Sequence, residues 1–201
     1  MSELTATQEK IHQVAKQHFL REGFQKASLR QIVSEAGYTL GAFYGYYQSK
    51  EDLFDALVKD TAEGIVKMIS AMGDRSDALQ PEQRKQQMSA LFAGGLPGLL
   101  DYLLEHRDET YLLLRCSEGT RYEHFLSGLM QRNLASARQM SGSKLPMHPI
   151  AANLLERSYF ALLGDAALSD ASKEDIATSM QDIQDFYAAG LLGLMKREEK
   201  R

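Results

Sequence analysis

The sequence contains a single cysteine and no long apolar segment. One cysteine, Cys116, among 201 residues excludes an intramolecular disulfide framework and a zinc site built from several cysteines. A lone thiol in a helical region is usually a small core residue, which we favour over a redox sensor with a lowered thiol pKa. No apolar run approaches the ~20 residues that span a bilayer, and the N-terminus lacks the apolar stretch of a signal peptide. We therefore expect a soluble, cytoplasmic protein with no membrane partner.

The sequence signatures of catalysis are also missing. It has no glycine-rich phosphate loop, no nucleophile elbow and no helix with two metal-binding histidines. His106 and His124 lie eighteen residues apart without supporting ligands. In the first helix, His12 is expected on the polar side and His18 on the apolar stripe, as a core histidine. We therefore expect no enzyme, no metal and no cofactor.

Alternating apolar runs of the strand type are absent as well. From residue 50 onward the apolar spacing is helical, and the helix that begins there is predicted to run past residue 68. Glycine, proline and serine clusters predict where the helices break. We expect these breaks at 73–76, around Pro81, at 94–98, near Gly119, at 141–149 and at 169–172. The chain is therefore predicted to be all-α, with about nine helices.

The most informative segment, residues 28–53, opens with two short helices joined by a glycine turn. Apolar residues recur at i, i+3, i+4 and i+7 in the first helix and at i, i+3 and i+7 in the second, as in amphipathic helices. These positions are Leu29, Ile32, Val33 and Ala36, then Leu40, Phe43 and Tyr47. Ser28 and Thr39 are placed to cap the two helices, and Gly37 allows the chain to turn. This arrangement is typical of a helix-turn-helix, whose second helix enters the major groove of DNA.

The outer side of the second helix is suited to DNA. Gly41 and Ala42 are small enough for close approach, and the phenols of Tyr44 and Tyr46 can donate hydrogen bonds to phosphate oxygens. An upstream helix with its own apolar stripe, residues 11–19, supplies the surface against which the two short helices pack.

A further helix is predicted to begin at Lys50. Ser49 is placed to cap it, and Glu51 and Asp52 suit the positive end of its dipole. Lys50 does not suit that end, so its position needs another reason. A phosphate bound at the start of the helix would be one.

Residues 7 to about 55 resemble the DNA-binding domain of the TetR family of transcriptional regulators. The shared pattern consists of Ala36-Gly37, Gly41-Ala42-Phe43-Tyr44 and Ser49 to Leu53. The resemblance implies that Ser28, Tyr44 and Lys50 contact backbone phosphates. It also implies that the residues facing the bases or the adjacent backbone are Thr39, Leu40, Gly41, Ala42 and Tyr46. Leu40 offers no bidentate hydrogen bond to a base edge, so direct readout of the sequence is expected to be sparse.

Charge is distributed unevenly along the chain. Residues 1–50 carry six Lys or Arg and four Asp or Glu, a net charge of +2, whereas the rest carries seventeen and twenty-three, a net charge of −6. This segregation favours DNA binding by the N-terminal part. We therefore predict a helix-turn-helix DNA-binding domain at 1–49 and a larger helical ligand-binding and dimerisation domain at 50–201.

The last two helices are the predicted site of self-association. Their apolar stripes run nearly the full length of each helix, although any single residue of the stripes could equally bury the domain's own core. The predicted interface residues are Leu155, Tyr159, Leu162, Leu163, Ala166, Ile176, Met180, Ile183, Tyr187, Gly190 and Leu194. In TetR-like proteins the corresponding helices of two subunits form a four-helix interface. A twofold dimer reads two half-sites about one helical turn, ~34 Å, apart.

The middle helices are predicted to enclose a ligand. Aromatic and apolar residues at helical spacing suit either a pocket or plain core, and the polar segment 115–125 follows an apolar run. The candidate ligand-binding residues are Phe92, Leu99, Tyr102, Tyr111, Arg115, Glu118, Tyr122 and Tyr159. If Arg115 or Glu118 points inward it needs a partner, which is either the ligand or the other of the two.

Together these features predict a homodimeric regulator of transcription that responds to a ligand. By resemblance we expect a repressor, released from a palindromic double-stranded DNA operator by a small apolar or amphipathic effector. Two alternatives remain open: an all-helical carrier or scavenging protein that binds small molecules but does not read DNA, and an activator of the same family.

Overall fold

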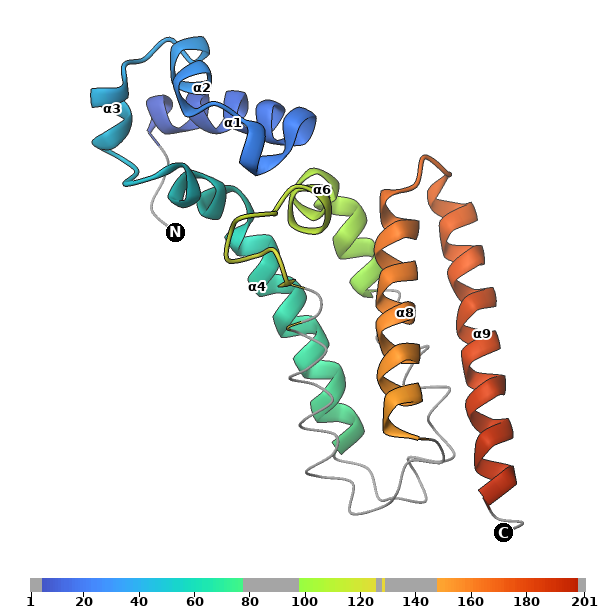
Figure 1. Cartoon of the computed structure of the whole chain (residues 1–201). Coiled ribbons are helices and arrows are strands. Elements are labelled where there is room, and N and C mark those ends of the chain that lie inside the picture. Colours follow the sequence, from blue (N-terminus) through green and yellow to red (C-terminus); the bar gives the residue numbers. More distant parts are fainter. Residues whose placement is uncertain (1–4, 78–97, 126–127, 129–147, 199–201) are drawn as a thin grey trace. The chain divides into compact units, whose positions relative to one another are not determined.

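A computed structural model describes residues 5–77, 98–125, 128 and 148–198, and all regular structure in these ranges is helical (Figure 1). The predicted all-α class is therefore confirmed for the described residues. The chain divides into two compact units. The first consists of Met1–Glu63 with His106–Phe125, and the second of Gly64–Glu105 with Leu126–Arg201.

The first unit contains the predicted helix-turn-helix. Its helices are α1 (Ala6–Lys26), α2 (Leu29–Glu35), α3 (Leu40–Tyr44), the first half of α4 (Lys50–Asp77) and α6 (Arg107–Arg115). A capping box starts α1, because the Thr5 side chain accepts from the Gln8 amide while the Gln8 side chain accepts from the Thr5 amide. Near its other end, Gly23 leaves the helical conformation at φ 75°, which a glycine adopts at little cost.

Aromatic and branched side chains fill the core of the first unit. The largest fully buried ones are Ile11, Phe19, Ile32, Val33, Phe43, Leu53, Phe54, Val58, Leu112 and Leu113. Phe54 of α4 meets two rings of α1 edge to face, with centroids 5.3 Å from Phe19 and 5.4 Å from Phe24. The predicted apolar face of α1 is thus confirmed, and α6 packs against the same helix.

α4 continues from the first unit into the second. Its start is capped as predicted, since the Ser49 hydroxyl accepts from the Asp52 amide at 3.0 Å. The helix runs to Asp77, so the prediction that it passes residue 68 is confirmed and the predicted break at 73–76 is wrong. A single glycine inside a long helix costs only ~1 kcal/mol, which the neighbouring residues of a long helix offset.

The second unit contains the helical residues 98–105, α8 (Pro149–Leu168) and α9 (Lys173–Glu198). The predicted break at 169–172 separates α8 from α9, which pack against each other. Tyr159 and Leu163 of α8 and Ile176 and Met180 of α9 are buried. None of the described helices combines the length and the apolar composition that a membrane span requires.

Candidate nucleic-acid interface

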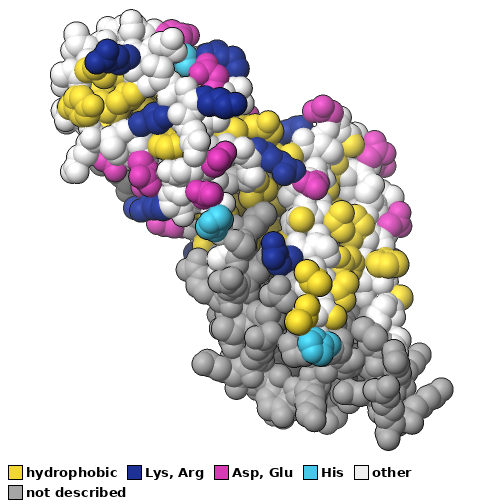
Figure 2. Space-filling view, viewed as in Figure 1, with side chains coloured by type: hydrophobic (Ala, Val, Ile, Leu, Met, Phe, Trp, Pro, Cys, Tyr) yellow, Lys and Arg dark blue, Asp and Glu magenta, His cyan; other side chains and the backbone are white. Residues whose placement is uncertain are grey.

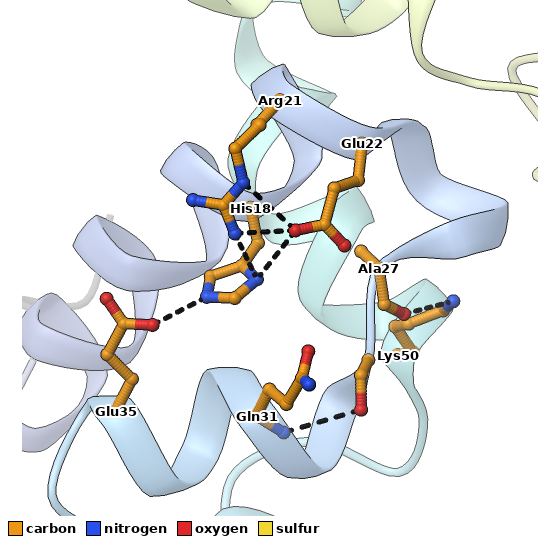
Figure 3. Close-up of polar contacts among 8 residues, drawn as sticks. His18, Arg21, Glu22, Ala27, Gln31, Glu35 and Lys50 are labelled. Carbon is orange, nitrogen blue, oxygen red and sulfur yellow. Dashed lines mark hydrogen bonds and ion pairs between the residues drawn. The ribbon is translucent and has the colours of Figure 1, made fainter.

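Local hydrogen bonds fix the turn between α2 and α3. The Ser28 hydroxyl accepts from the Gln31 amide at 3.4 Å, a bond drawn in Figure 3. The Thr39 hydroxyl accepts from the Ala42 amide at 3.2 Å. Between the two helices, Gly37 has φ 85°, a conformation that favours glycine. Both predicted caps and the predicted glycine turn are confirmed.

One side of α3 is buried and the other faces solvent. Phe43 is fully buried, whereas Gly41 and Ala42 are exposed and Tyr44 is 57% exposed. Tyr46, 43% exposed, lies in the turn that follows α3 rather than on the helix itself. Figure 2 shows hydrophobic-type side chains, a class that includes tyrosine and alanine, gathered at the α3 end of this unit beside Lys and Arg. Such a surface offers close backbone approach and phenol donors together.

A residue that follows α3 is held in place by a contact with α1. Tyr47 is buried, and its hydroxyl lies 2.6 Å from Nε2 of His12. The prediction that His12 lies on the polar side of α1 is wrong, because its ring is half-buried against Tyr47. Burial, with Lys16 as a second cause, lowers the pKa of His12 below its ordinary 6.5. Burial also raises the pKa of the Tyr47 phenol.

Lys50 turns back onto the end of α1. Its ammonium donates to the backbone carbonyls of Phe24 at 2.6 Å, Ala27 at 2.9 Å and Gln25 at 3.3 Å. Its Nζ atom also lies 4.4 Å from the centroid of the Phe24 ring. Because the last carbonyls of a helix lack intrahelical partners, a cation is favourable at this position. The structure thus supplies a reason for a lysine at the start of α4 that the sequence reasoning did not find. Burial lowers the pKa of the ammonium.

The buried His18 joins α1 to the end of α2 (Figure 3). Its Nε2 atom lies 2.8 Å from Oε2 of Glu35. Its Nδ1 atom lies 3.2 Å from Nη2 of Arg21 and 3.6 Å from Oε1 of Glu22. The prediction of a core histidine is confirmed, and its polar partners hold α2 in place beneath the turn.

The comparisons with known proteins agree with this geometry. Residues 11–57 match the family described as bacterial regulatory proteins, tetR family. The matched segment is thus a TetR-type helix-turn-helix domain. The chain is 24% identical over 148 residues to an uncharacterized HTH-type transcriptional regulator of Bacillus subtilis, YdgC, covering 72% of this chain and 73% of that protein.

Solved structures show the same fold. A TetR-family member from Streptomyces coelicolor A3 matches with a TM-score of 0.57 and 16% identity, over 91% of this chain and 89% of the other. A TetR-family regulator from Syntrophomonas wolfei also matches with a TM-score of 0.57 and 16% identity, over 92% and 96%. At this level of identity the likeness is one of fold.

The eight predicted DNA-binding residues all lie in the first unit. They are Ser28, Thr39, Leu40, Gly41, Ala42, Tyr44, Tyr46 and Lys50. Leu40 is half-buried, so its side chain is shared between the core and the surface. Lys50 differs from the exposed members of the set, because its ammonium already has partners within the protein. Contact with DNA remains a prediction for every residue of the set.

Sequence reasoning missed the polar cluster that attaches the segment after α6 to α4. The carboxylate of Asp55 accepts from the Tyr122 hydroxyl at 2.5 Å and pairs with Arg121. The backbone amide of Arg121 donates to Glu51 at 3.1 Å. Burial and the bond to Asp55 raise the pKa of Tyr122 to about 12. No local pattern signals this cluster, because its partners lie about seventy residues apart in the sequence.

The predicted ligand-binding residues do not gather in one described unit. Tyr111, Arg115 and Glu118 are exposed, so neither charged side chain is in the buried position that would require a partner. The reason is that α6 buries the opposite face, with Thr110, Leu112 and Leu113, against its neighbours. These residues and Tyr122 belong to the first unit; Leu99, Tyr102 and Tyr159 belong to the second, and Phe92 lies outside the described residues. Their role in ligand binding stays a prediction.

The predicted dimer residues divide between core and surface. Tyr159, Leu163, Ile176 and Met180 are buried within the chain, which is compatible with the alternative of own-core packing, and their part in a dimer stays a prediction. Ala166, Ile183 and Tyr187 are half-buried, Leu155, Leu162 and Gly190 are exposed, and the side chain of Leu194 lies outside the described residues. Sequence reasoning missed Ile150, Leu154 and Phe186, which are the most exposed large hydrophobic side chains among the described residues of these helices.

Cys116 is buried at the end of α6. Burial raises the pKa of its thiol, which is the opposite of what a reactive thiolate requires. The interpretation of Cys116 as a small core residue is therefore supported.

Proposed function

We propose that this TetR-family regulator is a homodimeric repressor that releases its DNA operator when a small apolar or amphipathic effector binds. The DNA-binding part of this proposal rests on the capped helix α3 and the turn that follows it, both of which expose side chains to solvent. Tyr44 and Tyr46 present phenols to solvent while Phe43 and Tyr47 anchor the same segment in the core. Rigid support beneath exposed donors is what phosphate recognition requires.

The apolar surface of the second unit supports the dimer. Phe186 of α9 is 75% exposed, and Ile150 and Leu154 of α8 are 65% and 57% exposed. Large apolar side chains concentrated on two neighbouring helices are a property of interfaces rather than of free surfaces. A second copy of the chain, placing its own α8 and α9 on this surface, would bury them and give the regulator two recognition helices.

A buried amide in the second unit supports an amphipathic effector. Gln184 of α9 is 7% exposed and interacts with the side chain of Tyr159, and in the described part of the chain no donor is placed in good hydrogen-bond geometry at its buried Oε1 atom. A buried acceptor of this kind costs free energy unless a donor reaches it. An effector with an apolar body and one hydroxyl or amide donor would supply that partner.

The proposed mechanism is a shift of populations. The effector binds more tightly to a conformer in which the two recognition helices no longer fit successive major grooves. A preference of ~2.7 kcal/mol for that conformer lowers operator occupancy about a hundredfold.

The DNA-binding part is tested by gel shift with the intergenic DNA upstream of the coding sequence, at fixed salt. Tyr44→Phe is expected to weaken binding to all sequences alike, because it removes a phosphate donor. Tyr111→Phe, which changes an exposed tyrosine on α6, serves as the matched control and is expected to bind normally. Absence of binding by the unmodified protein would favour the carrier alternative, and loss of preference at one base pair alone would contradict the phosphate role.

The dimer is tested by sedimentation. Phe186→Ser is expected to yield monomers that remain folded, since the side chain is exposed within the chain. Asp182→Ser, an exposed polar position on the same helix, is the control. A monomeric unmodified protein would refute the dimer.

The effector is sought by titrating apolar and amphipathic compounds into the protein–DNA complex. A compound that releases DNA through the proposed contact is expected to lose potency with Gln184→Leu. A compound that binds tightly without changing DNA affinity would refute the mechanism.

A further inference from the structure

The Lys50 ammonium has no hydrogen left for a further partner. An ammonium group carries three N–H donors and no acceptor. All three are matched by the carbonyls of Phe24, Gln25 and Ala27, at 2.6, 3.3 and 2.9 Å. The ring of Phe24 covers the same ammonium at 4.4 Å. In this conformation Lys50 cannot donate to a DNA phosphate without breaking a bond that it already makes.

The three carbonyls and the Phe24 ring, here called the α1 cage, are themselves held in place. The amide of Phe24 donates to the carbonyl of Cys116 at 2.9 Å, and the amide of Ala27 donates to the carbonyl of Gly23 at 3.2 Å. The Phe24 ring packs edge to face on Phe54 in the core. Because these contacts hold the cage in place, the Lys50 ammonium must move away from the cage when the two separate.

We propose that the α1 cage competes with DNA phosphate for Lys50, so that the protein binds DNA less tightly than it would if the Lys50 ammonium were not held by the cage. This inference rests on the proposed DNA-binding function and goes beyond it, because it makes one phosphate contact conditional on an internal bond. Any change that loosens the cage strengthens DNA binding. Any change that removes the ammonium weakens it.

Phe24 is the positioning residue through which the cage can be loosened without touching Lys50. Phe24→Leu removes the ring from the ammonium and keeps an apolar side chain in the core. Phe19→Leu is the matched control, because Phe19 is buried in the same aromatic group, with its ring centroid 5.9 Å from that of Phe24, whereas the ring over the Lys50 ammonium is that of Phe24. Both variants disturb the aromatic core around Phe24, but only the first removes the ring that lies over the ammonium.

The experiment measures binding of the full chain to a random-sequence DNA duplex by fluorescence anisotropy over a range of salt. Phosphate contacts do not depend on sequence, so this probe requires no knowledge of the operator. Phe24→Leu is expected to bind about two- to fivefold more tightly than Phe19→Leu. This factor corresponds to the free energy of one cation–π contact. Lys50→Met is expected to bind more weakly and to lower the salt slope by about 0.9.

A direct readout follows the lysine ammonium by nitrogen-15 NMR. Its resonance, assigned by its loss in Lys50→Met, is expected to show slow proton exchange in the free protein and to shift when the duplex binds. The measurement is made on the unmodified protein and needs Lys50→Met only for the assignment, so it decides the question even if Phe24→Leu fails to fold.

Three outcomes would overturn the inference. They are equal affinities of Phe24→Leu and Phe19→Leu, weaker binding by Phe24→Leu to the extent seen with Lys50→Met, and an ammonium resonance that DNA leaves unchanged. Failure of the proposed function has a different signature, because the unmodified protein would then bind no duplex even at low salt.

Discussion

Lys50→Met is expected to destabilise the first unit in the absence of any DNA. The change removes the donor for three carbonyls at the end of α1, two of them partly buried. A hydrogen bond to a charged group contributes ~1.5–3 kcal/mol, and water can replace part of the bonding at a half-buried lysine. We therefore expect the free energy of unfolding to fall by about 2 kcal/mol, far more than an exposed lysine would give.

The assay is denaturant unfolding followed by far-ultraviolet circular dichroism. A fall in the midpoint at an unchanged slope reports a loss of stability. Lys59→Met is the matched control, because Lys59 lies on the same helix, is 52% exposed and approaches Glu63 only at 3.9 Å. Its effect is expected to stay within ~0.5 kcal/mol.

Hydrogen exchange assigns the loss to the end of α1. The amide of Ala27, which donates to Gly23, is expected to exchange faster in Lys50→Met than in Lys59→Met. Equal midpoints for the two variants, or unchanged exchange at Ala27, would show that the carbonyls of the α1 cage do not depend on Lys50.

Three further changes test other contacts. The pKa of His12 is lowered in the folded protein, so its contribution to the free energy of unfolding is fully present above pH 6.5, the ordinary pKa, and is lost as the pH falls below that value. His12→Asn should therefore flatten this part of a plot of stability against pH. Tyr122→Phe removes the hydroxyl bonded to Asp55 and is expected to cost about 1 kcal/mol in denaturant unfolding. A Cβ atom at Gly64 would overlap the Tyr102 hydroxyl, so Gly64→Ala is expected to lower the melting temperature. The added change Tyr102→Leu is expected to restore part of it. A melting temperature for Gly64→Ala equal to that of the unmodified protein would contradict this packing.

The helix-turn-helix could be predicted from the sequence because its determinants are local. Ser28 and Thr39 each cap a helix through an amide three residues later, and Gly37 supplies a positive φ between them. Each of these interactions is contained in a few consecutive letters. Sequence spacing is therefore a sufficient guide to them.

The partners of Lys50 could not be predicted in the same way. The sequence showed that a cation at the start of α4 was unfavourable on dipole grounds, and this was a real signal. The carbonyls that satisfy it lie twenty-three to twenty-six residues earlier, at the end of another helix. Only the packing of α1 on α4 brings the two together.

The α8 and α9 pair illustrates a different limit. Periodicity shows that a helix has an apolar stripe, but apolar residues here occupy more than one face. Tyr159 and Met180 are buried within the chain, whereas Leu154 and Phe186 face outward. The sequence does not tell which stripe packs against the other helix of the same chain and which packs against another subunit, because either packing buries apolar area equally well.

The first compact unit extends beyond the predicted boundary at residue 49. Phe54 of α4 completes the aromatic core of α1, and the bonds of Asp55 to the segment after α6 tie residues 106–125 to the same unit. The carbonyl of Cys116 in that segment fixes Phe24, and Phe24 in turn holds Lys50. The surface proposed to meet DNA is therefore supported by residues that follow it by about seventy positions. A disturbance of that later segment would reach Lys50 through two hydrogen bonds, without any change in the helix-turn-helix itself.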